Sequence, residues 1–224
     1  MLATPIPAAP YVHRAVVLGR SVQGRPIVAF EVGDPKSPRR VLVVGCIHGN
    51  EPAGVAIADA LARGRPVAGA DLWIVPDLNP DGVAEDARQN ADRVDLNRNF
   101  PWQWQPLGPP GTTFYAGRRA LSEPESRMVE RLVLRVRPQI SIWFHQHLDV
   151  VDESGGDTRI ERRFASLVQM PLRRLTRYPG SATAWENHTL PGTTSFVVEL
   201  PPGHVSNKRV GIFTRAIRSL AASR

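Results

Sequence analysis

The chain has 224 residues, a length suited to one domain, and its 42% hydrophobic and 22% charged residues are typical of a soluble globular protein. The formal net charge is +7, and 26 of the 28 basic residues are arginine. These arginines are scattered, without a long basic block or a nucleic-acid-binding motif, so no nucleic-acid partner is expected. No run approaches the ~20 apolar residues of a membrane span, so no membrane partner is expected either.

The first residues, MLATPIPAAP, have no basic residue ahead of an apolar stretch, which argues against a secretory signal. We therefore expect a cytoplasmic protein, with a secreted form whose leader is absent from this sequence as the alternative. The single cysteine, Cys46, excludes an intrachain disulfide. It lies in the apolar run VLVVGCIH, which favours a buried core residue over a nucleophile.

Runs rich in β-branched residues alternate with helical patterns, and we find no internal repeat. In chain order, we predict strands at 27–32 and 41–47, a helix at 52–64, a strand at 71–76, a helix at 122–136, a strand at 140–146, a helix at 158–169, a strand at 194–200 and a helix at 205–222. The strands are apolar on both faces, which suits a sheet between helical layers. This order predicts one α/β domain over 1–224, with a twisted, mixed but mostly parallel sheet flanked by helices.

Two local patterns add detail. The helix at 122–136 has a clear start, with Ser122 as the N-cap and Glu-Pro-Glu in the first turn. The stretch 77–118 is rich in Asn, Asp, Gly, Pro and Arg. A polar segment of this length inside a compact domain is usually functional.

Three acid or imidazole side chains fall at predicted strand ends. His48 follows the strand at 41–47, and His145 and Glu199 lie near the ends of two later strands. Ligands in open α/β sheets bind beyond the carboxyl ends of the strands. This convergence predicts a functional site at that edge of the sheet.

His48 and Glu51 form an H-x-x-E pattern at a strand-to-helix junction. Catalytic zinc takes three imidazole or carboxylate ligands and keeps one position open. The third ligand is expected from the strand SIWFHQH, where His145 and His147 are two residues apart and face the same side, so spacing does not choose between them. A helix cap and a surface hydrogen bond are the alternative interpretation of the H-x-x-E pattern.

Other candidates follow from side-chain chemistry. Glu199 ends an apolar run, where a carboxylate suits a general base beside a metal and a solvent-exposed strand end is the alternative. Asn97 and Arg98 suit carboxylate recognition, and Arg88 could stabilise a developing oxyanion. In an arginine-rich chain, surface positions are the alternative for both arginines.

Seven segments together resemble the carboxypeptidase A type of zinc metallocarboxypeptidase. They occur in the family's order from about residue 19 to 203: GRSVQGRPI, HGNEPAG, DLNPDG, RQNADRVDLNRNFP, YAGRRALSEPES, SIWFHQH and FVVELPPG. The resemblance implies one zinc ion per chain. It also implies hydrolysis of the amide bond before the C-terminal residue of a peptide with a free carboxylate.

The resemblance also implies roles for the metal-site residues. His48 and Glu51 resemble the first two zinc ligands, and His145 resembles the third, with His147 as the fallback. Asp95 resembles the acid that orients the first histidine.

Substrate-site roles follow in the same way. Arg88 resembles the oxyanion-stabilising arginine, Asn97 and Arg98 resemble the pair that holds the terminal carboxylate, and Glu199 resembles the general base. Tyr178, in a short loop, is the counterpart proposed for the family's gating tyrosine, with a packed loop tyrosine as the alternative.

One branch of the family is favoured. No pro-segment or disulfide is visible, and ELPP follows the last predicted strand, as in the bacterial murein peptide amidases. That branch implies cleavage of the γ-D-glutamyl–meso-diaminopimelate bond. The alternatives are an N-acyl amino acid deacylase, resembling aspartoacylase and succinylglutamate desuccinylase, and a peptide-binding module without catalysis. The sequence does not determine the oligomeric state.

Overall fold

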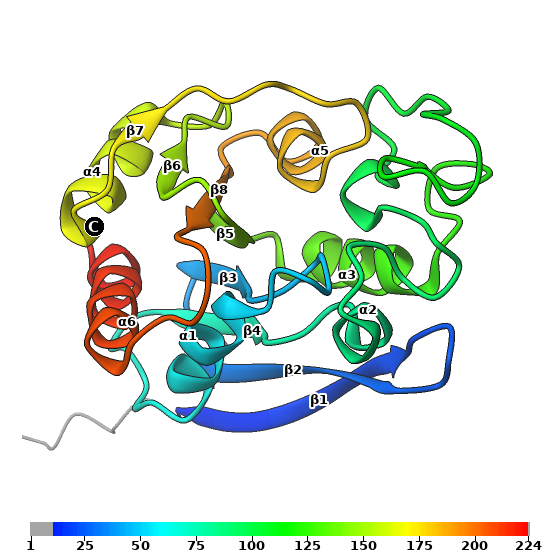
Figure 1. The fold of residues 1–224 in the computed structure, drawn as a ribbon. Helices are drawn as coiled ribbons and strands as arrows, with labels where there is room; N and C mark the ends of the chain where they lie inside the picture. Colours follow the sequence, from blue (N-terminus) through cyan, green and yellow to red (C-terminus); the bar gives the residue numbers. More distant parts are fainter. Residues whose placement is uncertain (1–10, 224) are drawn as a thin grey trace, which may run out of the picture.

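The computed structural model describes residues 11–223, so the N-terminal stretch considered for a secretory signal lies outside the described residues. Within this range, an eight-stranded sheet runs in the order β1-β2-β4-β3-β5-β8-β6-β7 (Figure 1). The pairs β3–β4, β3–β5, β5–β8 and β6–β7 are parallel, and the other three are antiparallel. The predicted single α/β domain with a mixed, mostly parallel sheet is confirmed.

The elements have the following bounds. The strands are β1 (Val12–Arg20), β2 (Pro26–Gly33), β3 (Arg40–Val44), β4 (Asp71–Val75), β5 (Ile140–Gln146), β6 (Val150–Asp152), β7 (Leu172–Arg173) and β8 (Thr194–Leu200). The helices are α1 (Ala53–Ala62), α2 (Pro80–Glu85), α3 (Pro124–Val136), α4 (Thr158–Val168), α5 (Ala182–Thr189) and α6 (Asn207–Ala222), with a 3-10 turn, η1 (Leu96–Arg98).

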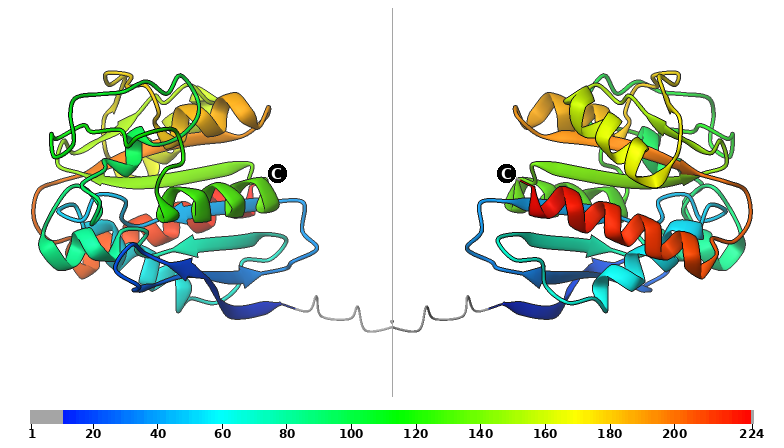
Figure 2. Two further views of the ribbon diagram at one scale, coloured as in Figure 1. Left: turned by 90° about the vertical axis from the view of Figure 1, so that its right-hand side faces the viewer. Right: turned by 90° about the vertical axis from the view of Figure 1, so that its left-hand side faces the viewer.

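Alternate side chains of the central strands enter two apolar cores, one on each face of the sheet. Val41 and Val43 face the core that contains residues of α1, α4 and α6. Leu42 and Val44 face the core that contains residues of α3 and α5. Figure 2 shows α3 and α6 crossing opposite faces of the sheet. Because both faces are covered, β3 and β4 are apolar after their first residues.

All five predicted strands exist, but the strand predicted at 41–47 ends at Val44, so the residues from 45 to 52 form a turn before α1. The prediction missed β1, β6, β7, α2 and α5. β1 is an edge strand whose residues are all exposed or half-buried, and β6 and β7 contain only three and two residues. The two missed helices contain six and eight residues, too few for a clear helical period.

The start of α3 differs from the prediction. Glu123, not Ser122, is the N-cap, and Pro124 is the first helical residue. The Ser122 hydroxyl instead donates to Glu123 Oε1 at 2.6 Å and accepts from Asn99 Nδ2 at 2.9 Å. Tertiary hydrogen bonds therefore replace the predicted cap. Cys46 is fully buried, as predicted.

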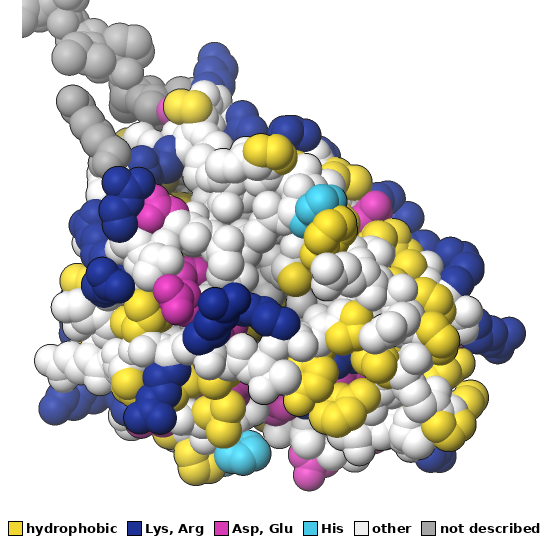
Figure 3. All heavy atoms as spheres, turned by 90° about the horizontal axis from the view of Figure 1, so that it is seen from above, with side chains coloured by type: hydrophobic (Ala, Val, Ile, Leu, Met, Phe, Trp, Pro, Cys, Tyr) yellow, Lys and Arg dark blue, Asp and Glu magenta, His cyan; other side chains and the backbone are white. Residues whose placement is uncertain are grey.

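The surface carries its basic residues in a dispersed pattern. On the face seen from above, the Lys and Arg side chains are spread among other side chains and do not form one continuous patch (Figure 3). Within residues 11–223, no helix has both the length and the apolar character needed to cross a bilayer.

Candidate metal centre

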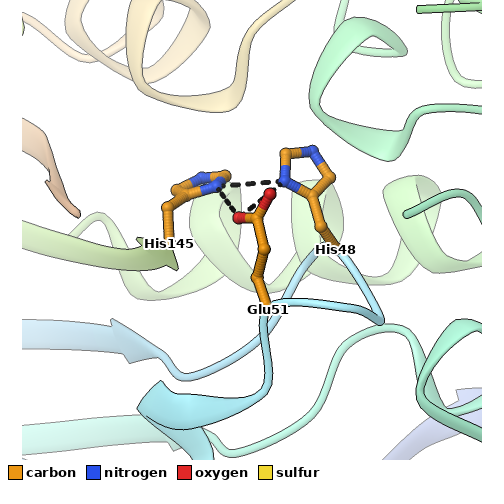
Figure 4. A group of neighbouring side chains, drawn as sticks. All are labelled: His48, Glu51 and His145. Atoms are coloured by element: carbon orange, nitrogen blue, oxygen red, sulfur yellow. Dashed lines mark hydrogen bonds and ion pairs between the residues drawn. The ribbon is translucent and has the colours of Figure 1, made fainter. Parts of the chain in front are cut away.

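Three buried side chains converge at the carboxyl end of the sheet. His48 and Glu51 lie on the turn between β3 and α1, and His145 lies on β5, the neighbour of β3. Glu51 Oε2 is 3.0 Å from the Nδ1 atom of each histidine, and the two Nδ1 atoms are 3.1 Å apart (Figure 4). His147 is exposed and lies outside this cluster, so the structure selects His145 over the fallback.

The donor set fits zinc. Two imidazole nitrogens and one carboxylate oxygen lie within 4.8 Å of one another and could hold a metal ion. Zinc binds such donors at about 2.0–2.2 Å, so the ligand atoms around one tetrahedral ion lie roughly 3.3–3.6 Å apart. The observed separations of 3.0 and 3.1 Å are slightly shorter, so a small outward movement of the three side chains would fit one ion. Three protein ligands also leave the fourth position that a catalytic site requires.

The turn that carries His48 and Glu51 depends on close backbone packing. A Cβ on Gly49 would lie 1.9 Å from the carbonyl carbon of Gly82, so only glycine fits there. The backbone N–H of Gln146 donates to Glu51 Oε2 at 3.2 Å. The side-chain Oε1 of Gln146 accepts from the backbone N–H of Ala53 at 3.0 Å. Gln146 therefore connects a ligand carboxylate to the first residue of α1.

Asp95 and Arg88 surround the ligands. Asp95 Oδ1 is 3.0 Å from His48 Nε2, which directs Nδ1 of this ring toward Glu51. Arg88 donates to Asp95 Oδ2 at 3.0 Å and to Glu51 Oε1 at 2.9 Å. Burial lowers the pKa of His48, but the neighbouring carboxylates of Asp95 and Glu51 outweigh burial and raise its pKa overall. The same negative field favours a bound cation.

A cavity of about 290 Å³ opens beside the ligand cluster. Each candidate ligand, catalytic and substrate-binding residue predicted from the sequence, apart from the fallback histidine, contributes to its wall. These residues are His48, Glu51, Arg88, Asn97, Arg98, His145, Tyr178 and Glu199. Since they come from the β3–α1 turn, the polar segment, β5, β8 and the loop before α5, the fold is what brings them together.

Arg98 is a buried cation in the cavity wall. Its Nη1 donates to the Asn97 carbonyl at 2.6 Å, its Nε has no hydrogen-bond partner, and no carboxylate within residues 11–223 forms an ion pair with it. The Arg98 guanidinium carbon lies 4.2 Å from the ring centroid of Tyr178 and 5.2 Å from that of Phe114, and these two rings stack on each other. Arg98 therefore has hydrogen-bond donors available for an anionic ligand.

Asn97 contacts a ligand histidine as well as the cavity. Its Nδ2 is 3.5 Å from His145 Nε2, and its Oδ1 accepts from the Ala182 amide at 2.9 Å. The side chain thus connects the 3-10 turn η1 to the start of α5 and lies beside the His145 ring.

Glu199 lies beside the metal ligands. It pairs with His145 in the parallel register of β5 and β8, and its Oε2 is buried with no hydrogen-bond partner among the residues that the structure describes. Burial raises the pKa of Glu199, and the nearby Glu51 charge adds to this effect while His145 opposes it. A carboxylate with these properties is suited to exchange a proton with a ligand in the cavity.

Other cavity residues were missed in the sequence. Phe114 lies within the polar segment 77–118, which was predicted to be functional without this residue being singled out. Asp152 and Arg177 also line the cavity, and they form an ion pair with an N–O distance of 2.9 Å. No motif indicates them, because they are far apart in the sequence and meet only in the fold.

This chain is similar to known proteins over most of its length. The family model for zinc carboxypeptidases matches residues 7–160, a range that contains the three candidate ligands but neither Tyr178 nor Glu199. Murein peptide amidase A of Vibrio campbellii is 30% identical over 202 residues, covering 82% of this chain and 78% of that protein. The murein peptide amidase A of Escherichia coli K12 is 28% identical over 181 residues, covering 75% and 74%.

Solved structures share the fold. A murein-tripeptide amidase from Escherichia coli O157 aligns with a TM-score of 0.77 at 24% identity, covering 100% of this chain and 99% of that chain. The carboxypeptidase A from Helicoverpa armigera aligns with a TM-score of 0.80 at 20% identity, covering 95% and 68%.

Proposed function

This chain belongs to the zinc carboxypeptidase family and is a zinc hydrolase, and we propose that it cleaves the γ-D-glutamyl–meso-diaminopimelate bond of murein peptides. One observation carries the proposal: a single cavity combines the three candidate ligands, the buried Arg98 and Glu199, and within residues 11–223 Arg98 has no carboxylate partner and Glu199 has an unpaired oxygen. The similarity to two murein peptide amidases over most of each chain supports the choice of substrate.

Substrate binding is assigned to the cationic side of the cavity. Arg98 would bind the terminal carboxylate of the peptide, because its free donors line the cavity and its charge lacks a carboxylate partner within the described residues. Asn97 lies beside it, and the Tyr178 ring covers its guanidinium. This arrangement restricts cleavage to a bond next to a free C-terminus.

The reaction is assigned to the part of the cavity wall that carries the candidate metal ligands. His48, Glu51 and His145 would hold the zinc ion, which when bound supplies Lewis acidity toward the scissile carbonyl and acidifies water. Glu199 accepts the proton of the attacking water and delivers it to the amine that leaves as the amide bond breaks. Arg88 keeps N–H groups beyond those bonded to Glu51 and Asp95, and these would stabilise the negative charge that develops on the carbonyl oxygen.

The test combines metal analysis with hydrolysis of L-Ala-γ-D-Glu-meso-diaminopimelate, with and without chelator. We expect one zinc ion per chain and release of diaminopimelate that stops when zinc is removed. The same peptide with an amidated C-terminus should react about 10- to 100-fold more slowly, because it loses a charge-assisted hydrogen bond to Arg98.

Other results would redirect the assignment. Zinc without cleavage of this peptide would remove the murein substrate and leave a metallopeptidase. Hydrolysis of N-acetyl amino acids in preference to peptides would favour the deacylase alternative. Absence of zinc after reconstitution would favour a peptide-binding module without catalysis.

A further inference from the structure

One part of the cavity wall has no role in the mechanism described above. It consists of Asp152, at the end of β6, and residues 175–177 of the loop that follows β7. Asp152 is only 4% exposed. A carboxylate buried beside a substrate cavity is costly unless it is paired, so its surroundings are informative.

Asp152 is paired but not saturated. Its Oδ2 accepts from the Ser154 hydroxyl at 2.6 Å and from Arg177 Nη1 at 2.9 Å. Among the described residues, its Oδ1 accepts from the Leu175 amide alone, at 2.8 Å. A carboxylate has about four acceptor sites, so Oδ1 retains capacity for another donor. Asp152 therefore holds the loop in place and can still bind a cationic group.

Arg177 is the neighbouring positive charge. It lines the same cavity, and its side chain is 36% exposed. Its Nη2 donates to the Glu153 carbonyl, and its Nη1 donates to Asp152. Its guanidinium has five N–H groups, so donors remain for a carboxylate.

The cavity thus places opposite charges side by side, in addition to Arg98. An apolar side chain in this region would remove water from both charges without replacing its hydrogen bonds. A basic side chain would match only Asp152, and an acidic one only Arg177. A side chain that ends in both an ammonium and a carboxylate group matches both charges at once.

We propose that Asp152 and Arg177 are specificity-determining residues that recognise a zwitterionic end on the side chain of the substrate's C-terminal residue. The ammonium group binds at Asp152 Oδ1 and the carboxylate at Arg177, while Arg98 holds the main-chain carboxylate. This inference rests on the proposed function, because a diaminopimelate residue ends in such a zwitterion.

The test compares kcat/KM for four peptides, L-Ala-γ-D-Glu-X. X is meso-diaminopimelate or one of three analogues of it. Lysine lacks the distal carboxylate, 2-aminopimelate lacks the distal ammonium, and norleucine lacks both groups. The wild type should prefer the diaminopimelate peptide to each of the others by about 10-fold or more, because each of the others loses at least one hydrogen bond to a charged group.

Two variants assign the charges. Arg177→Gln should reduce kcat/KM for the diaminopimelate and aminopimelate peptides about 10-fold relative to the lysine peptide. Asp152→Asn should reduce kcat/KM for the diaminopimelate and lysine peptides relative to the aminopimelate peptide. Asp152 also accepts from the Leu175 amide, so its substitution could loosen the loop and lower kcat/KM for all four peptides alike. The ratios of kcat/KM between peptides separate this effect from recognition of the side chain.

Asp157→Asn is the matched control, because the Asp157–Arg159 ion pair lies at the exposed start of α4, outside the cavity wall. It should leave the four ratios unchanged. Wild-type ratios in both the Arg177 and Asp152 variants, or equal cleavage of all four peptides by the wild type, would overturn this inference and leave the proposed function intact. Cleavage of none by the wild type would overturn both.

Discussion

Glu199 enters the cavity from a buried strand, where a carboxylate without a hydrogen-bond partner is costly. Its neighbour in the sheet is the ligand His145, so its position follows from the register of β5 and β8. Burial raises the pKa of Glu199, so the carboxylate becomes a stronger base and accepts a proton more readily. Burial therefore supports a catalytic role for this residue.

We predict that Glu199→Gln lowers kcat/KM by about 10²- to 10⁴-fold, the usual contribution of a general base. Zinc content should not change, because the three ligands remain in place. Metal analysis and steady-state kinetics check both parts. Glu130→Gln on α3 serves as the control, since Glu130 lies outside the cavity wall. A near-normal rate for Glu199→Gln would show that another group accepts the proton.

At the scale of elements, the loop before α5 is held against the segment that carries Arg98. Gly180 exchanges backbone hydrogen bonds with Phe100 and Trp102. It has φ +70°, and a Cβ there would lie 2.2 Å from the Arg98 carbonyl oxygen. The same loop places the Tyr178 ring over the Arg98 guanidinium. Close backbone packing at one glycine therefore sets the position of the anion-binding side of the cavity.

We predict that Gly180→Ala destabilises the protein by ~1–3 kcal/mol more than Gly69→Ala, because of the added steric overlap. Gly69 is a matched control, since it has the same φ of +70° but no atom within 4 Å of the position that an alanine Cβ would take. Both variants carry the cost of a left-handed alanine, ~1–2 kcal/mol. Urea denaturation measures the difference. Equal destabilisation would mean that the loop moves away from Arg98 at no cost.

At the scale of the whole molecule, a buried carboxyl group couples stability to pH. Glu186 on α5 is 0% exposed, and its Oε1 accepts from Trp143 Nε1 of β5 at 2.8 Å. Burial raises the pKa of Glu186 from 4.5 to about 7. Between these values the unfolded chain releases the proton while the folded chain retains it. The stability of the fold therefore decreases as the pH rises through this window.

We predict that Glu186→Gln removes this contribution, because a neutral amide can still accept from Trp143. The stability of the wild type relative to the variant should fall by roughly 3 kcal/mol from about pH 4.5 to pH 8, at ~1.4 kcal/mol per pKa unit. Urea denaturation at several pH values tests this. Parallel stability profiles for the two proteins would show that Glu186 does not retain its proton in the fold.

Particular residues show how far sequence reasoning reaches. The H-x-x-E pattern indicated His48 and Glu51 as candidate ligands, because both residues lie on one turn. Spacing did not choose between His145 and His147, since both would face the same side of an ideal strand. β5 ends at Gln146, so His147 leaves the sheet and is exposed. The choice depended on where a strand stops, which neighbouring strands and loops decide.

By itself, the sequence determined the α/β class, the buried central strands, the polar segment that reaches the cavity and the chemical types of the candidate site residues. Periodicity and short motifs carry this information because they depend on neighbouring residues in the chain. Only the tertiary structure decided which histidine joins the cluster of candidate ligands, the orientation of Asn97 toward His145 and the pairing of Asp152 with Arg177. These depend on strand order, strand ends and loop packing, which bring together residues that are distant in the sequence.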